Sequence, residues 1–215
     1  MSRIVFLAAI EAELRPLKSH LNQQRFSEEI ETEFIEVGVG VINSICLLYK
    51  KIKSLSKLDW IILIGTAGII GKKFVPGKIY QASVFRWGSV GIALGVGYLP
   101  QSLYPDLPAR VVKDVPQDIE EIPVITTPEI TSSEKGASAL KKQYGPGLEN
   151  LEAYGIARLF KSYNLSLSAF FSVTNQVGQE SHQQYLNYRE LAWKNLAKAV
   201  DNIIKQGGKV LNRIE

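Results

Sequence analysis

The stretch Asp59-Trp-Ile-Ile-Leu-Ile64, followed at once by Gly65-Thr-Ala-Gly68, decides the fold class of this 215-residue chain. A short, uninterrupted apolar run that ends at glycines is typical of a buried strand. We therefore predict a strand over 59–64 that stops at Gly65. Glycine lets a ligand oxygen approach the backbone closely, and Thr66 adds a hydroxyl, so the segment 65–68 is either a binding loop or a plain tight turn.

Apolar runs and helical spacing predict the other elements on both sides of this strand. The predicted strands cover 4–8, 32–37, 78–85, 90–94, 124–125 and 167–173. The predicted helices cover 11–21, 134–144, 149–163 and 183–204, and one more is marked by Ile45, Leu48, Ile52 and Leu55. We expect the first helix to begin near Glu11–Glu13, so that Pro16 lies in its first turn. Prolines crowd the stretch 100–123, which predicts an extended, loop-rich segment.

The alternation of strands and helices predicts an α/β fold. We expect a single domain over 1–215, built as a three-layer sandwich with a central mixed β-sheet flanked by helices. Ligands bind such sheets outside the carboxyl ends of the strands. Four expected strand ends carry glycine or polar residues: 8–11, 38–40, 65–68 and 174–175. We predict that these segments converge on one site.

Composition excludes several classes of protein. Apolar residues make up 46% and charged residues 21%, which excludes a disordered chain, a collagen-like repeat and a disulfide scaffold. The net charge is only +4 without a basic run, so no nucleic-acid partner is expected. The run 87–105 is interrupted by four glycines and two prolines, so we expect no membrane helix there. One cysteine, Cys46, and two histidines give no zinc pattern and favour a cytoplasmic location.

Three polar residues near these strand ends are the strongest candidates for chemistry. Glu13 follows the first strand, where a glutamate either faces the site or only complements the helix dipole. Glu152 precedes small residues that permit close packing, and a buried carboxylate there needs donors such as sugar hydroxyls; the alternative is a capping or surface glutamate. Asn175 has an amide that matches the N7/O6 edge of a 6-oxopurine, although turn asparagines are common.

Taken in order, these short motifs resemble the purine nucleoside phosphorylase/nucleosidase superfamily. The nearest branches are the methylthioadenosine/S-adenosylhomocysteine nucleosidases and the futalosine hydrolases. The motifs are Ala9-Ile-Glu-Ala-Glu13, Gly38-Val-Gly40, Gly65-Thr-Ala-Gly68, Leu151-Glu-Ala153 and Val173-Thr-Asn175. The resemblance extends from Ile4 to Ile204 and rests on the order and spacing of the motifs.

The resemblance implies a role for each residue of the expected site. Glu13 resembles the acid/base that activates water, and Glu152 resembles the carboxylate that holds the ribose hydroxyls. Asn175 occupies the place of the residue that contacts the purine, which is aspartate in the adenine-specific branch. The other implied positions are Leu151 under the sugar, Gly65 and Thr66 beside the water or phosphate, and Ile130 or Thr131 beside the base. The family works without a metal or organic cofactor and implies a homodimer.

We therefore expect a nucleosidase that hydrolyses the N-ribosidic bond of a purine nucleoside, futalosine- or methylthioadenosine-like. Leu63 and Ile64 stand where the phosphorylases of this superfamily carry an arginine for phosphate, which favours water as the nucleophile. Two alternatives stay open: a phosphate-dependent phosphorylase, and a non-catalytic descendant that binds a nucleoside. Asn175 and the atypical segment 176–188 motivate the second.

Overall fold

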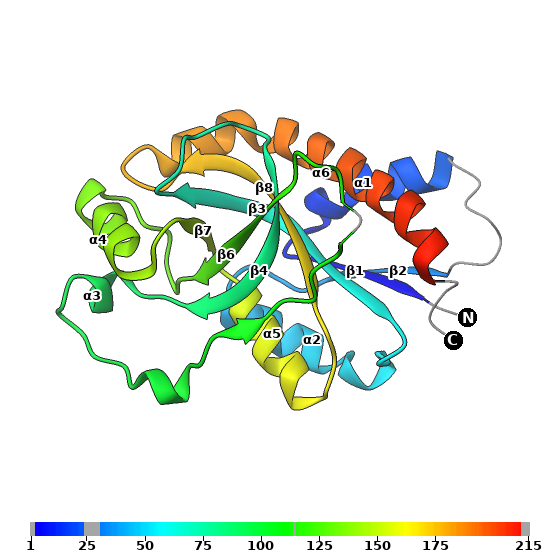
Figure 1. Cartoon of the computed structure of the whole chain (residues 1–215), viewed down its shortest axis with the longest axis horizontal. Coiled ribbons are helices and arrows are strands. Elements are labelled where there is room, and N and C mark those ends of the chain that lie inside the picture. Colours follow the sequence, from blue (N-terminus) through cyan, green and yellow to red (C-terminus); the bar gives the residue numbers. More distant parts are fainter. Residues whose placement is uncertain (1–2, 24–30, 114, 212–215) are drawn as a thin grey trace.

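The computed structural model describes residues 3–23, 31–113 and 115–211, which form an eight-stranded mixed sheet between helices (Figure 1). The strands are β1 Ile4–Ala8, β2 Thr32–Glu36, β3 Trp60–Ile70, β4 Ile79–Trp87, β5 Leu107–Pro108, β6 Glu120–Thr126, β7 Gly147–Asn150 and β8 Ser168–Gln176. The helices are α1 Glu11–Gln23, α2 Val41–Tyr49, α3 Val90–Ala93, α4 Glu134–Tyr144, α5 Ala153–Ser162 and α6 Ser181–Leu211, with 3₁₀ turns at Ile52–Ser54 and Gln101–Leu103. The predicted three-layer α/β architecture is confirmed.

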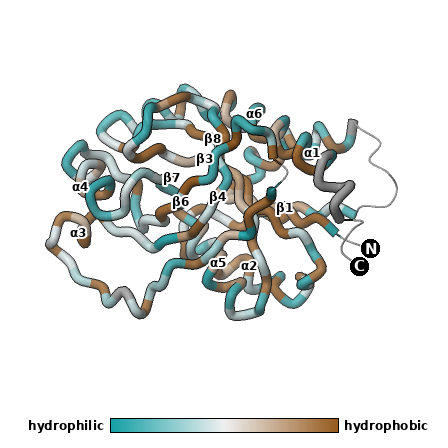
Figure 2. The backbone as a smooth tube through the Cα atoms, in the orientation of Figure 1, coloured by the Kyte–Doolittle hydropathy of each residue, from teal (hydrophilic) through white to brown (hydrophobic). Residues whose placement is uncertain are grey.

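Helices cover both faces of the sheet because the central strands are apolar on both faces. Along β1, Phe6 faces a core that α1 and α6 complete, while Val5 and Leu7 face a second core that α2 and α5 complete. Figure 1 shows α1 and α6 along one side of the sheet and α2 and α5 along the other. Figure 2 shows the hydrophobic colour concentrated in β1, whereas α4 is mostly hydrophilic.

The sheet also closes on itself, which the sequence did not predict. The strand β8 pairs in parallel with β3 and antiparallel with β4. Parallel pairs then join β4 to β6 and β6 to β7, and β7 returns antiparallel to the far end of β3. These five strands form a closed ring, and β1 and β2 extend it as an open sheet from β3.

The strand β3 corrects the prediction of a turn at Gly65. It continues through Gly65 and Gly68 to Ile70, with a register shift against β8 between Ala67 and Gly68. Pairing with β8 holds Gly65 in extended backbone, and Gly68 is paired on both edges, by β8 and by β7. The strand β8 likewise runs on to Gln176, three residues beyond the predicted end.

Four other predicted elements differ from the structure. The segment 90–94 is helix α3 rather than a strand, since the hydroxyl of Ser89 caps it by accepting from Ile92 N at 3.4 Å. The strand predicted over 124–125 is the longer β6, which accommodates Pro123 opposite the register shift in β4. Residues 147–150 form β7, so the helix predicted over 149–163 begins only at Ala153. The second helix ends at Tyr49, before Ile52 and Leu55.

The long helices lie close to their predicted positions. Helix α4 has the predicted bounds, and α6 extends beyond the predicted 183–204 in both directions. Helix α1 starts at Glu11 as predicted, but Pro16 lies in its second turn rather than its first. A proline there leaves the carbonyl of Ala12 without an intrahelical donor. Among the described residues, no helix is both long enough and apolar enough to cross a bilayer.

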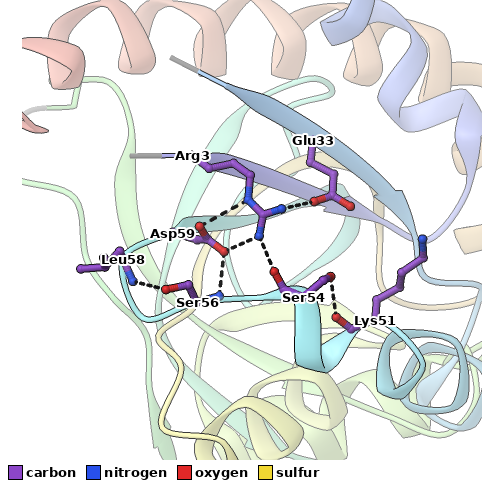
Figure 3. A network of polar contacts seen from close by, with 7 residues as sticks. All are labelled: Arg3, Glu33, Lys51, Ser54, Ser56, Leu58 and Asp59. Carbon is purple, nitrogen blue, oxygen red and sulfur yellow. Dashed lines mark hydrogen bonds and ion pairs between the residues drawn. The ribbon is translucent and has the colours of Figure 1, made fainter. Parts of the chain in front are cut away.

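One cationic side chain ties together the starts of the three strands of the open sheet (Figure 3). The guanidinium of Arg3 donates to Glu33 at 2.7 Å, to Asp59 at 2.7 Å and to the carbonyl of Ser54 at 2.6 Å. Asp59 also accepts from the backbone N–H of Ser56 at 2.8 Å. The network therefore sets the register of β1 against β2 and β3 at the end opposite their carboxyl ends.

Replacing Asp59 by alanine should lower the free energy of unfolding by about 1–3 kcal/mol, because two donors lose their buried acceptor. Glu33→Ala removes the other carboxylate partner of Arg3. The side chain of Glu33 is 30% exposed, whereas that of Asp59 is 7% exposed. That exposed pair should contribute less than about 1 kcal/mol. Urea unfolding of both variants measures the difference, and equal losses would contradict the burial argument.

Candidate active site

A cavity of about 300 Å³ lies where β1, β3, β7 and β8 meet the first turn of α1 and the start of α6. Seven of the eight predicted site residues line it: Glu13, Gly65, Thr66, Ile130, Leu151, Glu152 and Asn175. Thr131 stands behind the wall, where it hydrogen-bonds to Glu149. The predicted convergence of the strand ends on one site is therefore what the structure shows.

Glu13 is held in the cavity wall by one of its two oxygens. Its Oε1 accepts from the backbone N–H of Thr66 at 3.0 Å and from the Thr66 hydroxyl at 3.1 Å. Its Oε2 is buried without a hydrogen-bond partner. The carboxylate packs against Gly65, where a Cβ would lie at an ordinary contact distance of 3.5 Å from Oε1. The carboxylate is thus fixed on one side and free on the side that faces the cavity.

Burial is the main cause that raises the pKa of Glu13 to about 7, and the negative charge of Glu152 contributes to this rise. The hydrogen bonds from Thr66 oppose this shift without cancelling it. A carboxyl group with a pKa near neutrality can accept and return a proton at physiological pH.

Glu152 stands at the start of α5 and is oriented by two donors. Its Oε1 accepts from the N–H of Gly40 at 2.8 Å, and its Oε2 accepts from the Asn150 side chain at 2.8 Å. Gly40 has φ +82°, a backbone conformation that favours glycine. Asn150 also accepts from the N–H groups of Glu152 and Ala153, both at 2.8 Å, so the turn between β7 and α5 fixes the carboxylate. Burial raises the pKa of Glu152.

Asn175 presents one polar atom to the cavity. Its Oδ1 accepts from the Thr174 hydroxyl at 2.9 Å, while its Nδ2 makes only a long contact of 3.4 Å with the Gln176 carbonyl. The amide lies over Gly68, since a Cβ at Gly68 would come within 2.7 Å of Nδ2. The amide nitrogen is therefore the group with donor capacity left for a ligand.

Glu149 is a site residue that the sequence did not predict. It lies in β7 and is 5% exposed, and Thr131 donates to it from both its hydroxyl and its backbone N–H. Burial raises its pKa. The prediction of a helix over 149–163 concealed the role of Glu149 in the cavity wall. In the structure Glu149 lies in β7 and Glu152 is the N-cap residue of α5, so the two are not one helical turn apart.

Two further residues of the cavity wall come from α6 and also lacked a sequence signal. Tyr185 is part-buried, and its pKa is raised by burial and by the charge of Glu13. His182 is exposed and lies one turn earlier. They fall in the segment 176–188, whose sequence matched neither branch of the superfamily.

The cavity wall is acidic. Within the described part of the chain, its ionisable side chains are Glu13, Glu149, Glu152, His182 and Tyr185, with no lysine or arginine. No cluster of three or more potential metal ligands occurs among the residues that the structure describes.

No protein-family model and no curated protein matches the chain. Solved structures do match over nearly the whole chain. Futalosine hydrolase from Helicobacter pylori superposes with a TM-score of 0.78 at 13% identity, over 96% of this chain and 100% of that one. The 5'-methylthioadenosine/S-adenosylhomocysteine nucleosidase of the same organism gives 0.78 at 12% identity, over 95% and 98%. The chain has the nucleosidase fold.

A third structure extends the match to another organism. The nucleosidase from S. pneumoniae, solved with a transition-state inhibitor, gives a TM-score of 0.75 at 17% identity, over 94% of this chain and 98% of that one. The nucleosidase fold is therefore shared with two kinds of enzyme, and the fold alone does not choose between them.

Glu13→Gln should stabilise the ligand-free protein at pH 8 but not at pH 4. The folded-state pKa of about 7 lies above the ordinary value of 4.5, so the stability that protonated Glu13 contributes is lost as the pH rises through 7. Glutamine does not titrate, and the difference between variant and wild type should reach on the order of 3 kcal/mol above pH 7.

Urea unfolding between pH 4 and pH 8 measures this difference. Glu11→Gln is the matched control, because it removes the same charge from a side chain that is 45% exposed. A gain in stability that does not depend on pH would contradict the assignment to Glu13.

Proposed function

We propose that the chain hydrolyses the N-ribosidic bond of a purine nucleoside, futalosine- or methylthioadenosine-like. The observation that carries the proposal is the unpartnered Oε2 of Glu13, which is buried in the wall of a cavity that a second oriented carboxylate, Glu152, also lines. The shared fold with futalosine hydrolase and methylthioadenosine nucleosidases supports this reading.

In the proposed reaction Glu13 acts on water. Its Oε2 accepts a proton as the water oxygen attacks the anomeric carbon, and Thr66 keeps the carboxylate in place through Oε1. Glu152 accepts hydrogen bonds from the ribose hydroxyls, and Leu151 packs under the sugar. Both carboxylates stabilise the positive charge that develops on the ribosyl ring in an oxocarbenium-like transition state.

The leaving purine lies at the other end of the cavity, beside Ile130 and Asn175. The free amide nitrogen of Asn175 donates to N7 or O6 of a 6-oxopurine. Thr131 lies behind the wall, where its hydroxyl donates to Glu149, and it does not contact the base. An asparagine has no acidic proton to give to the leaving base. The site therefore suits a 6-oxopurine, whose departing anion can be stabilised by a hydrogen bond without being protonated.

Phosphate is a poor substitute for water here. Its negative charge requires a cationic partner, and the described wall contains no lysine or arginine. Leu63 and Ile64 both line the cavity, at the place where the resemblance puts the phosphate-binding arginine. Base release that does not depend on added phosphate separates hydrolysis from phosphorolysis, and ligand binding without any base release identifies a non-catalytic descendant.

We also propose a cytoplasmic homodimer. Helix α2 leaves an apolar face uncovered, on which Ile42 is 78% exposed and Tyr49 is 59% exposed. Leu47 and the preceding Val39 extend this face toward the cavity, which Val39 lines. A second copy of the chain would cover it.

Glu13→Gln should bind nucleosides but release base about 10²–10⁴-fold more slowly, because the general base is lost. Glu11→Gln is the control: Glu11 pairs with Lys18 outside the cavity wall and should retain activity. Chromatographic measurement of free base from futalosine, methylthioadenosine, inosine and adenosine gives the rates. Loss of activity in Glu11→Gln with retention in Glu13→Gln would reverse the assignment.

Asn175→Asp should shift the preference from 6-oxopurine toward adenine nucleosides. The change is nearly isosteric, and an aspartic acid in this closed site can stay protonated and give its proton to N7 of adenine. The measurement is the ratio of kcat/KM for adenosine and inosine in both proteins, with exposed Asn187→Asp as the control. A ratio that does not change would show that Asn175 does not contact the base.

Ile42→Glu should convert the dimer into a monomer, because a charge on the α2 face cannot be buried without a partner. The exposure of Ile42 means that the fold itself should be unaffected. Sedimentation velocity measures the mass of both proteins. A wild-type protein that sediments as a monomer contradicts the proposal.

A further inference from the structure

One buried carboxylate in the cavity has no role in the proposed hydrolysis. Glu149 lies in the wall and is 5% exposed. Thr131 donates to it with both hydroxyl and backbone N–H, which fixes its position. Burying a carboxylate without a cationic partner is costly, and Thr131 supplies only neutral donors.

The sheet places Glu149 beside the base. Gly68 of β3 is the register partner of Glu149 in β7 and of Asn175 in β8. Register partners project to the same face of a sheet, so these two side chains flank Gly68 on the face that bears the cavity. Since Gly68 has no side chain, the amide of Asn175 lies over it, and Glu149 lies on the strand that pairs with the opposite edge of β3.

The charge around the cavity is one-sided. Three carboxyl groups line the cavity, and one of them, Glu13, has a buried oxygen with no hydrogen-bond partner. No lysine or arginine stands in the described wall to compensate them. Arg189, one turn beyond Tyr185 on α6, interacts with Tyr185 from outside the wall. A cationic ligand would supply the missing partner.

We infer that this site also cleaves N-ribosides whose base carries a permanent positive charge, with Glu149 as the carboxylate that faces that charge. This inference rests on the proposed nucleosidase function and names a substrate class for it. Two kinds of base share the chemistry: a 7-alkylated purinium and a pyridinium.

The reaction balances without an acid at the base. Water attacks the anomeric carbon and gives one proton to Glu13. The electron pair of the glycosidic bond moves to the ring nitrogen of the base, which neutralises the positive charge of the ring. The products are ribose and a neutral base, and Glu13 then returns its proton to solvent. One proton is therefore released per turnover, whereas a neutral nucleoside keeps that proton on its departing base. This fits Asn175, which has no acidic proton to donate.

The first arm of the test compares inosine with 7-methylinosine and with nicotinamide riboside in the wild-type protein. Free base is measured by chromatography and proton release by a pH indicator in weak buffer. We expect base release from at least one cationic riboside. Nicotinamide riboside should release one proton per turnover, whereas 7-methylinosine should release one only at a pH at which its N1 is still protonated. Cleavage of 7-methylinosine alone identifies the purinium source, and cleavage of nicotinamide riboside alone identifies the pyridinium source.

The second arm assigns the effect to Glu149. Glu149→Gln should lower kcat/KM for the cationic riboside about 10- to 100-fold more than for inosine, because a nearby charge at a partly buried site is lost. The comparison divides the effect of the substitution on the cationic riboside by its effect on inosine, so the different intrinsic reactivities of the two glycosidic bonds cancel. Glu149→Asp keeps the charge and should preserve the preference. Glu129→Gln removes the same charge from an exposed position near Glu149 and should leave both rates unchanged.

The outcomes separate this inference from the function on which it rests. Cleavage of inosine or methylthioadenosine without cleavage of either cationic riboside overturns the inference and leaves the proposed function intact. An equal loss on both substrate classes in Glu149→Gln also overturns it, since Glu149 would then act only on the structure of the site. Failure to cleave any riboside overturns both.

Discussion

One end of β3 is paired with a strand on each of its two edges. The edges of β3 around Gly68 hydrogen-bond to β7 on one side and to β8 on the other, and this double pairing closes the ring of five strands. Three polar residues of the cavity take their positions from that closure. Asn175 lies on β8, Glu149 lies on β7, and Glu152 follows where β7 turns into α5.

The closed ring has an energetic consequence for its carboxyl groups. Strands that are paired on both edges and covered by helices leave little water around Glu13, Glu149 and Glu152, and burial is the main cause of the raised pKa of each. Each carboxyl keeps neutral donors from neighbouring residues, which reduces the cost of burial but adds no positive charge. The site is thus prepared for positive charge, whether it develops on a ribosyl ring or arrives with a ligand.

The sequence predicted the layers of the fold and most of the site, because apolar runs and helical spacing are local signals. It failed where long-range pairing overrides local preference. The sequence predicts that the strand stops at Gly65, in a binding loop or a turn, yet β8 holds Gly65 extended and both β7 and β8 hold Gly68 extended. The sequence places residues 149–150 at the start of a helix, because their strand partners in β3 and β6 lie far away in sequence.

The same limit applies to the individual site residues. Glu13 and Asn175 follow predicted strands, and Glu152 precedes a run of small residues near the start of a predicted helix, so all three could be proposed from local order. Glu149, His182 and Tyr185 could not, because their approach to the cavity depends on the ring closure and on the position at which α6 begins.

Gly68 also restricts how the specificity of this cavity can diverge. A Cβ at this position would come within 2.7 Å of the side chains of both Asn175 and Val177, so this position cannot be altered without moving these two side chains. Glu149 and Asn175, on the two neighbouring strands, are buried and accept hydrogen bonds from Thr131 and Thr174, so a change at either alters local contacts but not β3 itself. A change in substrate preference should therefore require substitutions on both β7 and β8. Relatives with other substrates should differ at 149 and 175 together and retain glycine at 68.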